Sequence, residues 1–184
     1  MDKTTYLNHY YFISIISFLM IFLPAGNWFS WDIVKNPTKS LPKIPAWNVD
    51  AIKLMLLIVY LYAGIAKLNS EWLLEAMPLK IWLPPKDDIP ILGFFFRYEW
   101  VIYFFSWVGA IFDLSIPFLL WFRKTRLLAF GLVVLFHLLT AILFPIGMFP
   151  YIMIISTLIF FSSKFHEKIL TFFSRYLKIP LKKT

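Results

Sequence analysis

Lys67 ends an uncharged apolar run, LMLLIVYLYAGIA, which extends from Leu54 to Ala66. One interpretation is that the long side chain of Lys67 reaches water while its methylene groups stay in apolar surroundings. The other is that the amine is buried, where the loss of water favours the neutral form that accepts a proton. The residue type and its setting therefore leave two roles open, a charged anchor and a base.

Four other polar side chains lie within apolar stretches: Asn8 and His9 in YLNHYYF, Asp113 in FDLSIPF and His137 in LFHLLTAILFPIGMF. His137 at that depth needs a partner and is a candidate functional residue, whereas His9 has an alternative role as an interface residue among tyrosines. Asp113 is read as structural, either bonding backbone groups freed by Pro117 or pairing with a cation. Three histidines without a paired carboxylate make a poor ligand set, so we predict no metal site.

The composition indicates an integral membrane protein. The chain is 60% hydrophobic and 15% charged, whereas soluble domains are about half apolar and about a quarter charged. The absence of cysteine excludes disulfides, thiol catalysis and thiolate metal sites. The net charge is +8, but the basic residues flank apolar runs, which favours contact with anionic lipid over nucleic acid. Neither a GxGxxG loop nor a GxSxG elbow occurs.

The apolar runs predict an all-α, polytopic membrane bundle of about five transmembrane helices. The expected spans are roughly Thr5–Leu23, Trp47–Asn69, Tyr98–Phe122, and two within Leu127–Ser163 that the FPIGMFP turn separates. SEWLLEAMPLKIWL predicts a short interfacial or re-entrant helix broken at Pro78. KFHEKILTFFSRYLK predicts a basic amphipathic surface helix that carries His166. The expected division is a membrane domain over residues 1–163 and a basic cytoplasmic tail over 164–184.

The distribution of charge predicts the orientation of the bundle. Five spans place most of the 18 Lys and Arg residues on the side of the C-terminus, which the positive-inside rule makes cytoplasmic. Residue 1 is then outside, which is unusual without a preceding signal, so we expect the domain to be incomplete at its N-terminus. We predict an integral protein of the bacterial inner membrane with its site on the extracytoplasmic side.

Helix geometry places the candidate residues at one level of the bilayer. Lys53 and Lys67 are about 21 Å apart along a helix, less than the hydrocarbon thickness of about 30 Å. Lys67 therefore lies about one turn inside the outer boundary, and Asn8, His9 and His137 fall in the same outer half. A lysine near two histidines and an amide, in an aromatic pocket, has the groups needed to take a proton from a lipid-soluble acid.

Four stretches of the chain resemble the HTTM membrane domain of the vitamin K-dependent gamma-carboxylase family. They are TTYLNHYYF at Thr4–Phe12, VYLYAGIAKLNSEWL at Val59–Leu73, FDLSIPFLLWFRKTR at Phe112–Arg126 and FHLLTAILFPIGMFPYIM at Phe136–Met153. They follow the family's order at closely similar spacing across nearly the whole chain. Four ordered blocks are a specific signal for the family.

The resemblance implies definite chemistry. In the family's carboxylase, a lysine matching Lys67 removes a proton from reduced vitamin K, the hydroquinone. O2 then adds, the oxygenated quinone takes the gamma proton of a peptide glutamate, and CO2 adds to the carbanion. The products are gamma-carboxyglutamate and vitamin K epoxide. By the same resemblance, His9 lies near the base as a second catalytic residue, His9 and Asn8 are partners of the quinone oxygens, and Tyr60 and His137 belong to the cofactor-binding pocket.

The chain also departs from the family's pattern. It reads Ala66-Lys67 where the carboxylase often has two adjacent lysines, and it ends before the large lumenal portion that helps to bind the protein substrate. The expectation is a carboxylase-like enzyme of the carbon–carbon lyase class, with a lipid-soluble quinone and a glutamate-containing peptide as partners. The alternatives are a non-carboxylating quinone- or lipid-binding protein of the same fold, and a structural or transport bundle in which Lys67 faces lipid.

Overall fold

The computed structural model describes residues 8–24, 31, 35–36 and 44–177. Within these residues the regular structure is helical and contains no β-strand, so the all-α prediction is confirmed for this part of the chain. Three helices are long and apolar enough to cross a membrane: α3 (Ala46–Ala66), α7 (Glu99–Trp121) and α8 (Arg126–Leu143).

The other two expected spans are shorter helices. These are α1 (Asn8–Phe22) and α9 (Phe149–Thr157). A 3-10 turn, η5 (Leu158–Phe160), continues α9. Pro150 lies in the first turn of α9, where its missing N–H costs no helical hydrogen bond. The predicted turn in the FPIGMFP segment is present, and its first five residues, 144–148, separate α8 from α9.

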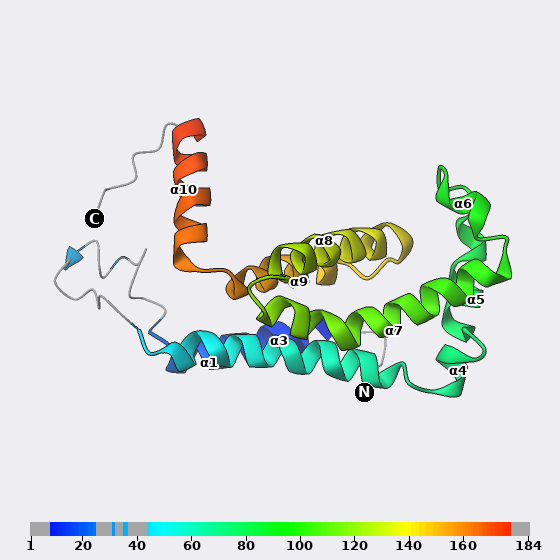
Figure 1. Ribbon diagram of the computed structural model, residues 1–184, viewed down its shortest axis with the longest axis horizontal. Coiled ribbons are helices and arrows are strands. Elements are labelled where there is room, and N and C mark those ends of the chain that lie inside the picture. The colour runs from blue at the N-terminus through cyan, green and yellow to red at the C-terminus, as the bar shows by residue number, and fades with distance from the viewer. Residues whose placement is uncertain (1–7, 25–30, 32–34, 37–43, 178–184) are drawn as a thin grey trace.

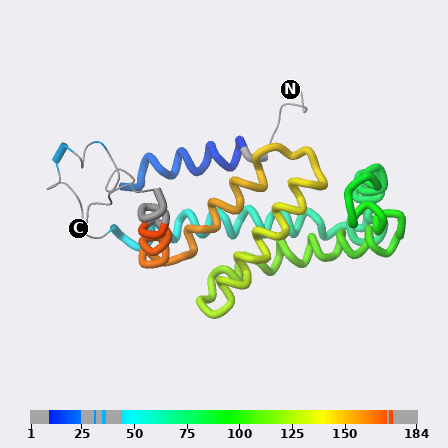
Figure 2. Tube along the Cα trace, turned by 90° about the horizontal axis from the view of Figure 1, so that it is seen from above, coloured from blue at the N-terminus to red at the C-terminus, as the bar shows by residue number. Residues whose placement is uncertain are grey.

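The helices of the bundle pack side by side (Figures 1 and 2). α3 lies along α7, and α8 packs on both α9 and α7, while α1 contacts α9. The main apolar core lies between these helices and includes Leu56, Ile116, Val133 and Met153, all almost fully buried. The core therefore joins one face of each helix in the bundle.

Gly64 marks a close approach of α3 to α7. A Cβ atom at Gly64 would lie 2.7 Å from the side chain of Leu114 and 3.1 Å from the Leu114 backbone nitrogen. Tyr60 and Gly64 of α3 and Lys67, which follows its last residue, lie on one side because they are spaced by about one helical turn. The small residue thus brings this face, with both polar side chains, against α7.

We predict that Gly64→Ala lowers the free energy of unfolding by about 1–3 kcal/mol, the usual cost of overpacking a core. The Leu114 backbone cannot move aside as a side chain could, so α3 must shift away from α7. Thermal unfolding of the purified protein in detergent measures the change. Gly109→Ala on α7 is the matched control, since its added Cβ has no described atom within 4 Å apart from its chain neighbours and the nearby backbone of its own helix. Equal losses in the two variants would contradict the close approach.

The segment between α3 and α7 forms a cap of short helices at one end of the bundle (Figure 1). The cap contains α4 (Ser70–Leu73), α5 (Met77–Trp82), the 3-10 turn η4 (Pro84–Lys86) and α6 (Leu92–Phe95). The prediction that this segment breaks at Pro78 is therefore wrong in the position of the break. The break falls at Ala76, which has a left-handed φ of 48°, and Pro78 lies in the first turn of α5, where proline is well tolerated.

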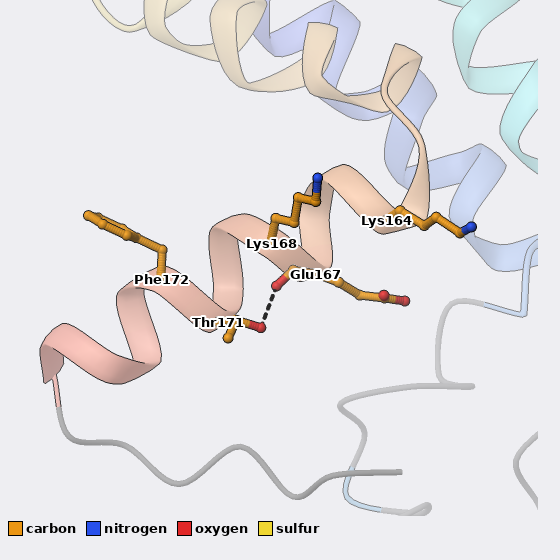
Figure 3. Close-up of a pocket in the computed structure, with 5 residues that line it drawn as sticks. All are labelled: Lys164, Glu167, Lys168, Thr171 and Phe172. Carbon is orange, nitrogen blue, oxygen red and sulfur yellow. Dashed lines mark hydrogen bonds between the residues drawn. The ribbon is translucent and has the colours of Figure 1, made fainter.

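The predicted C-terminal helix is present as α10 (Ser163–Leu177), at the opposite end of the bundle from the cap. Figure 1 shows it steeply inclined to α8 and α9. The close-up in Figure 3 shows a surface hollow on this helix, lined by Lys164, Glu167, Lys168, Thr171 and Phe172. None of the predicted site residues lines this hollow, so we place the candidate site within the bundle instead.

Candidate functional site

Lys67 is directed into the bundle and pairs with Asp113. It follows the last residue of α3, and its backbone N–H donates to the Gly64 carbonyl at 3.0 Å. Its Nζ donates to Asp113 Oδ2 on α7 in a short ion pair and to the Ala63 carbonyl at 3.3 Å. The side chains of Lys67 and Asp113 are 20% and 7% exposed. Of the two interpretations of Asp113, the structure shows the one in which it pairs with a cation.

A Lys67 ammonium paired with Asp113 has its nitrogen lone pair occupied and is not a base. Asp113 is the neighbouring group to which the ammonium could pass a proton. The arrangement therefore brings together an amine and a carboxylate between which a proton can move.

Trp72 covers Lys67 from the side of the cap. The centre of its indole ring lies 5.3 Å from Lys67 Nζ, within the range of a cation–π contact. Three hydrogen bonds fix Trp72: its backbone N–H donates to Asn69 Oδ1 at 2.8 Å, its Nε1 donates to the Ser106 carbonyl at 2.9 Å, and Ser106 Oγ donates to the Trp72 carbonyl. One side of the lysine is therefore covered by a ring that Asn69 and, on α7, Ser106 hold in place.

Two further side chains of α7 bind the end of α4 and the residue that follows it. Trp107 Nε1 donates to the Leu73 carbonyl at 2.7 Å, and the Tyr103 hydroxyl donates to the Leu74 carbonyl at 2.9 Å. Their partners are carbonyls that a short helix leaves without an internal donor. Sequence reasoning did not single out these residues, and the signal that could have found them was the row of Tyr, Ser and Trp side chains in one apolar run.

Lys80 anchors the other side of the cap on α7. Its Nζ lies 2.6 Å from Glu99 Oε1 and 3.1 Å from the Tyr103 hydroxyl oxygen. Hydrogen bonds to Glu99 and Tyr103 raise the pKa of Lys80 above its usual range, so this lysine stays charged. Its role is therefore that of a surface anchor, unlike that of Lys67.

Tyr60 and His137, both predicted as pocket residues, lie together in an aromatic cluster. Their ring centres are 6.0 Å apart, and the Tyr60 ring lies 6.1 Å from that of Phe112. Phe112 in turn stacks on Phe136 at 3.9 Å. His137 Nδ1 lies 3.0 Å from the Val133 carbonyl oxygen. The buried Tyr60 hydroxyl has no hydrogen-bond partner among the described residues.

The other two predicted residues, Asn8 and His9, lie in the first turn of α1. Figure 2 shows the beginning of α1 beside the beginning of α9, two helices that are in contact. The side chains of Asn8 and His9 lie outside the described part of the structure. Their predicted contact with the quinone and with Lys67 stays a prediction.

These features define a multi-helix membrane protein with a polar site enclosed between its helices. The family model described as the HTTM domain matches residues 1–165. The chain therefore belongs to the HTTM family, the membrane family related to the vitamin K-dependent carboxylase. No solved structure matches this chain.

Proposed function

We propose that this protein is a vitamin K-dependent gamma-carboxylase-like membrane enzyme in which Lys67 deprotonates a reduced quinone. The observation that supports this proposal most strongly is the enclosed pair of Lys67 and Asp113 at the end of an apolar helix. A lysine that only anchors the helix in the interface would extend toward water. An amine held against a carboxylate inside the bundle is instead placed for proton transfer.

The chain's own groups supply the proton transfers. The proton of the Lys67 ammonium moves to the Asp113 carboxylate, which leaves a neutral amine and a carboxylic acid. The amine would then take the proton of a quinol hydroxyl and return to the ammonium form. Bound reduced vitamin K, with O2 as co-substrate, supplies the strong base that removes the glutamate gamma proton before CO2 adds.

The described residues suit a quinone ring in two ways. The aromatic rings of Tyr60, Phe112 and Phe136 offer flat apolar surfaces, and the unpartnered Tyr60 hydroxyl offers a hydrogen bond to a ligand oxygen. Asn8 and His9 are proposed as further partners of the quinone oxygens on the basis of the family resemblance. Trp72 would help to exclude water from Lys67, which carbanion chemistry requires.

The second candidate is a quinone- or lipid-binding protein of the same fold without carboxylation. The ion pair itself supports this alternative. A Lys67 ammonium that stays protonated and paired with Asp113 can donate a hydrogen bond to an oxygen of the ligand, but it cannot accept a proton. In either case we place the site on the extracytoplasmic side of a bacterial inner membrane, opposite the positively charged end of the chain.

One assay separates the two candidates. Membranes that contain the protein receive reduced vitamin K, O2, labelled bicarbonate and a glutamate-containing peptide. We expect both vitamin K epoxide and label fixed in the peptide if the protein is a carboxylase. Epoxide without fixed label would limit the activity to the quinone. Neither product from folded protein would favour the binding protein and count against the enzyme.

A further inference from the structure

The cap carries a short apolar tip between the charged residues at 86–88 and Arg97. The tip, residues 89–96, reads IPILGFFF and contains no charged or polar side chain. Four large apolar side chains are exposed within it and just after it, and we call them the cap patch: Ile91, Phe94, Phe95 and Tyr98. The ring centre of Phe94 lies 5.6 Å from that of Phe95 and 5.8 Å from that of Tyr98, so the three rings form one surface cluster. Contiguous exposed apolar surface of this kind marks an interaction site.

The backbone exposes Ile91 through a strained turn. Ile91 has φ 70° and ψ −56°, and the Leu92 N–H donates to the Pro90 carbonyl at 2.8 Å. These values define the strained form of the γ-turn, which is rare and is an outlier for a branched side chain. Close packing maintains the turn, because a Cβ atom at Gly93 would collide with the Asp87 carbonyl group. The turn is therefore held in a conformation that leaves Ile91 82% exposed.

The cap patch continues directly into the outward surface of α7. Tyr98 is the N-cap residue of α7, which is long and apolar enough to cross a membrane. Trp100 and Trp107 on α7 are more than half exposed, and on a membrane-crossing helix such side chains contact lipid. Glu99, the one charged residue between the patch and Trp100, is paired with Lys80. The patch therefore lies where α7 enters the membrane (Figure 1).

The charges beside the tip suit the polar surface of a leaflet. Asp87 and Arg97 lie on opposite sides of the tip in the sequence, are exposed, and approach each other to 3.7 Å. An apolar tip between charged flanks is typical of a segment that enters one leaflet while its charges stay among the lipid headgroups. Eight residues are too few to cross a hydrocarbon layer of about 30 Å, so the tip enters one leaflet only.

We infer that the cap patch inserts into the leaflet on the cap's side of the membrane and contacts acyl chains just below the headgroups. The occupant of the patch is lipid, rather than another protein, because the patch is continuous with the lipid-facing surface of α7. The cap, which places Trp72 over Lys67, is then anchored twice, by its hydrogen bonds to α7 and by the leaflet. The insertion does not depend on the quinone chemistry proposed above.

Single spin labels measure the insertion directly, because the chain contains no cysteine and each variant carries one label. Ile91→Cys and Phe94→Cys are labelled with a nitroxide in protein reconstituted into vesicles of phosphatidylcholine and phosphatidylglycerol. Power-saturation EPR then measures the accessibility of each label to O2, which concentrates in the bilayer, and to a water-soluble nickel chelate. Ile111→Cys, on α7 and 64% exposed, is the lipid reference, and Asp88→Cys, exposed beside the tip, is the water reference.

We expect the ratio of O2 to nickel accessibility at Ile91 and Phe94 to be severalfold higher than at Asp88 and to approach the ratio at Ile111. Ratios as low as that of Asp88 would place the patch in water and overturn the inference. Labels that neither reagent reaches would place the patch against a second copy or another protein, which would overturn it as well. Phe95→Cys is a further reporter that leaves the turn unchanged if Ile91→Cys disturbs it.

A charge at the tip tests whether Ile91 holds the patch in the leaflet. Ile91→Asp in the Phe94→Cys background should lower the ratio at Phe94 toward that of Asp88, because a carboxylate resists transfer into hydrocarbon. Ile91→Leu in the same background is the matched control and should leave the ratio unchanged. Equal ratios in the two variants would overturn the role of Ile91 in the insertion.

Discussion

Replacement of Asp113 by leucine is expected to lower the free energy of unfolding by about 3–5 kcal/mol, the usual cost of removing one partner of a buried ion pair. The variant leaves the Lys67 ammonium enclosed without its counter-charge. Thermal or denaturant unfolding in detergent measures the loss. Asp50→Leu is the matched control, because exposed Asp50 pairs with Lys53 on the surface of α3 and such pairs contribute about 1 kcal/mol or less.

A second substitution tests whether the lost stability comes from the unpaired charge. Lys67→Met in the Asp113→Leu background removes the ammonium and fills its space with an apolar chain of similar length. Apolar replacements of buried ion pairs are often neutral or stabilising, so the double variant should regain most of the loss. A double variant as unstable as Asp113→Leu alone would show that packing of Asp113, rather than its charge, stabilises the bundle.

Lys67→Arg is expected to preserve the fold and to reduce quinone epoxidation by at least about 100-fold, the contribution of a general base. Arginine stays protonated in proteins and pairs well with a carboxylate, so the contact with Asp113 is kept while the base is lost. The initial rate of epoxide formation and the unfolding temperature are measured on the same preparation. Lys53→Arg, near the other end of α3, is the control and should change neither quantity.

The outcome of Lys67→Arg separates a base from a structural cation. Wild-type rates in this variant would mean that position 67 needs only a positive charge, which would contradict the assignment of the base. Loss of both activity and stability would indicate that the guanidinium does not fit the enclosed site. In that event Lys67→Met in the Asp113→Leu background provides a folded comparison without the amine.

The apolar runs were sufficient to predict the helical bundle, because hydrophobic length is a property of each segment by itself. The same reasoning could not predict which residue Lys67 would meet. That contact depends on the register between α3 and α7, to which the close approach at Gly64 contributes. Asp113 therefore had two possible roles in the sequence, and only the packing of the helices distinguished them.

The cap shows a second limit of sequence reasoning. Pro78 suggested a helix broken at that residue. The chain instead turns at Ala76, and Pro78 lies in the first turn of α5. The side chains of Tyr103, Ser106 and Trp107 lie in an apolar run and were counted as part of a span. They bind carbonyls at the end of α4, a tertiary arrangement that no periodicity in one segment reveals.

The resemblance brought Tyr60 and His137 to attention, and the structure places them in contact. What the residue pattern could not give is the hydrogen-bonding state of each group. The orphaned hydroxyl of Tyr60 and the Nδ1 contact of His137 emerge only when all neighbours are in place.

The most direct test of the central claim is epoxide formation from reduced vitamin K and O2 in membranes that contain either the wild-type protein or Lys67→Ala. We expect epoxide from the wild type and at least about a 100-fold lower rate from Lys67→Ala. Folded wild-type protein that forms no epoxide, or Lys67→Ala that forms it at the wild-type rate, would contradict Lys67 as the base of a quinone-dependent enzyme.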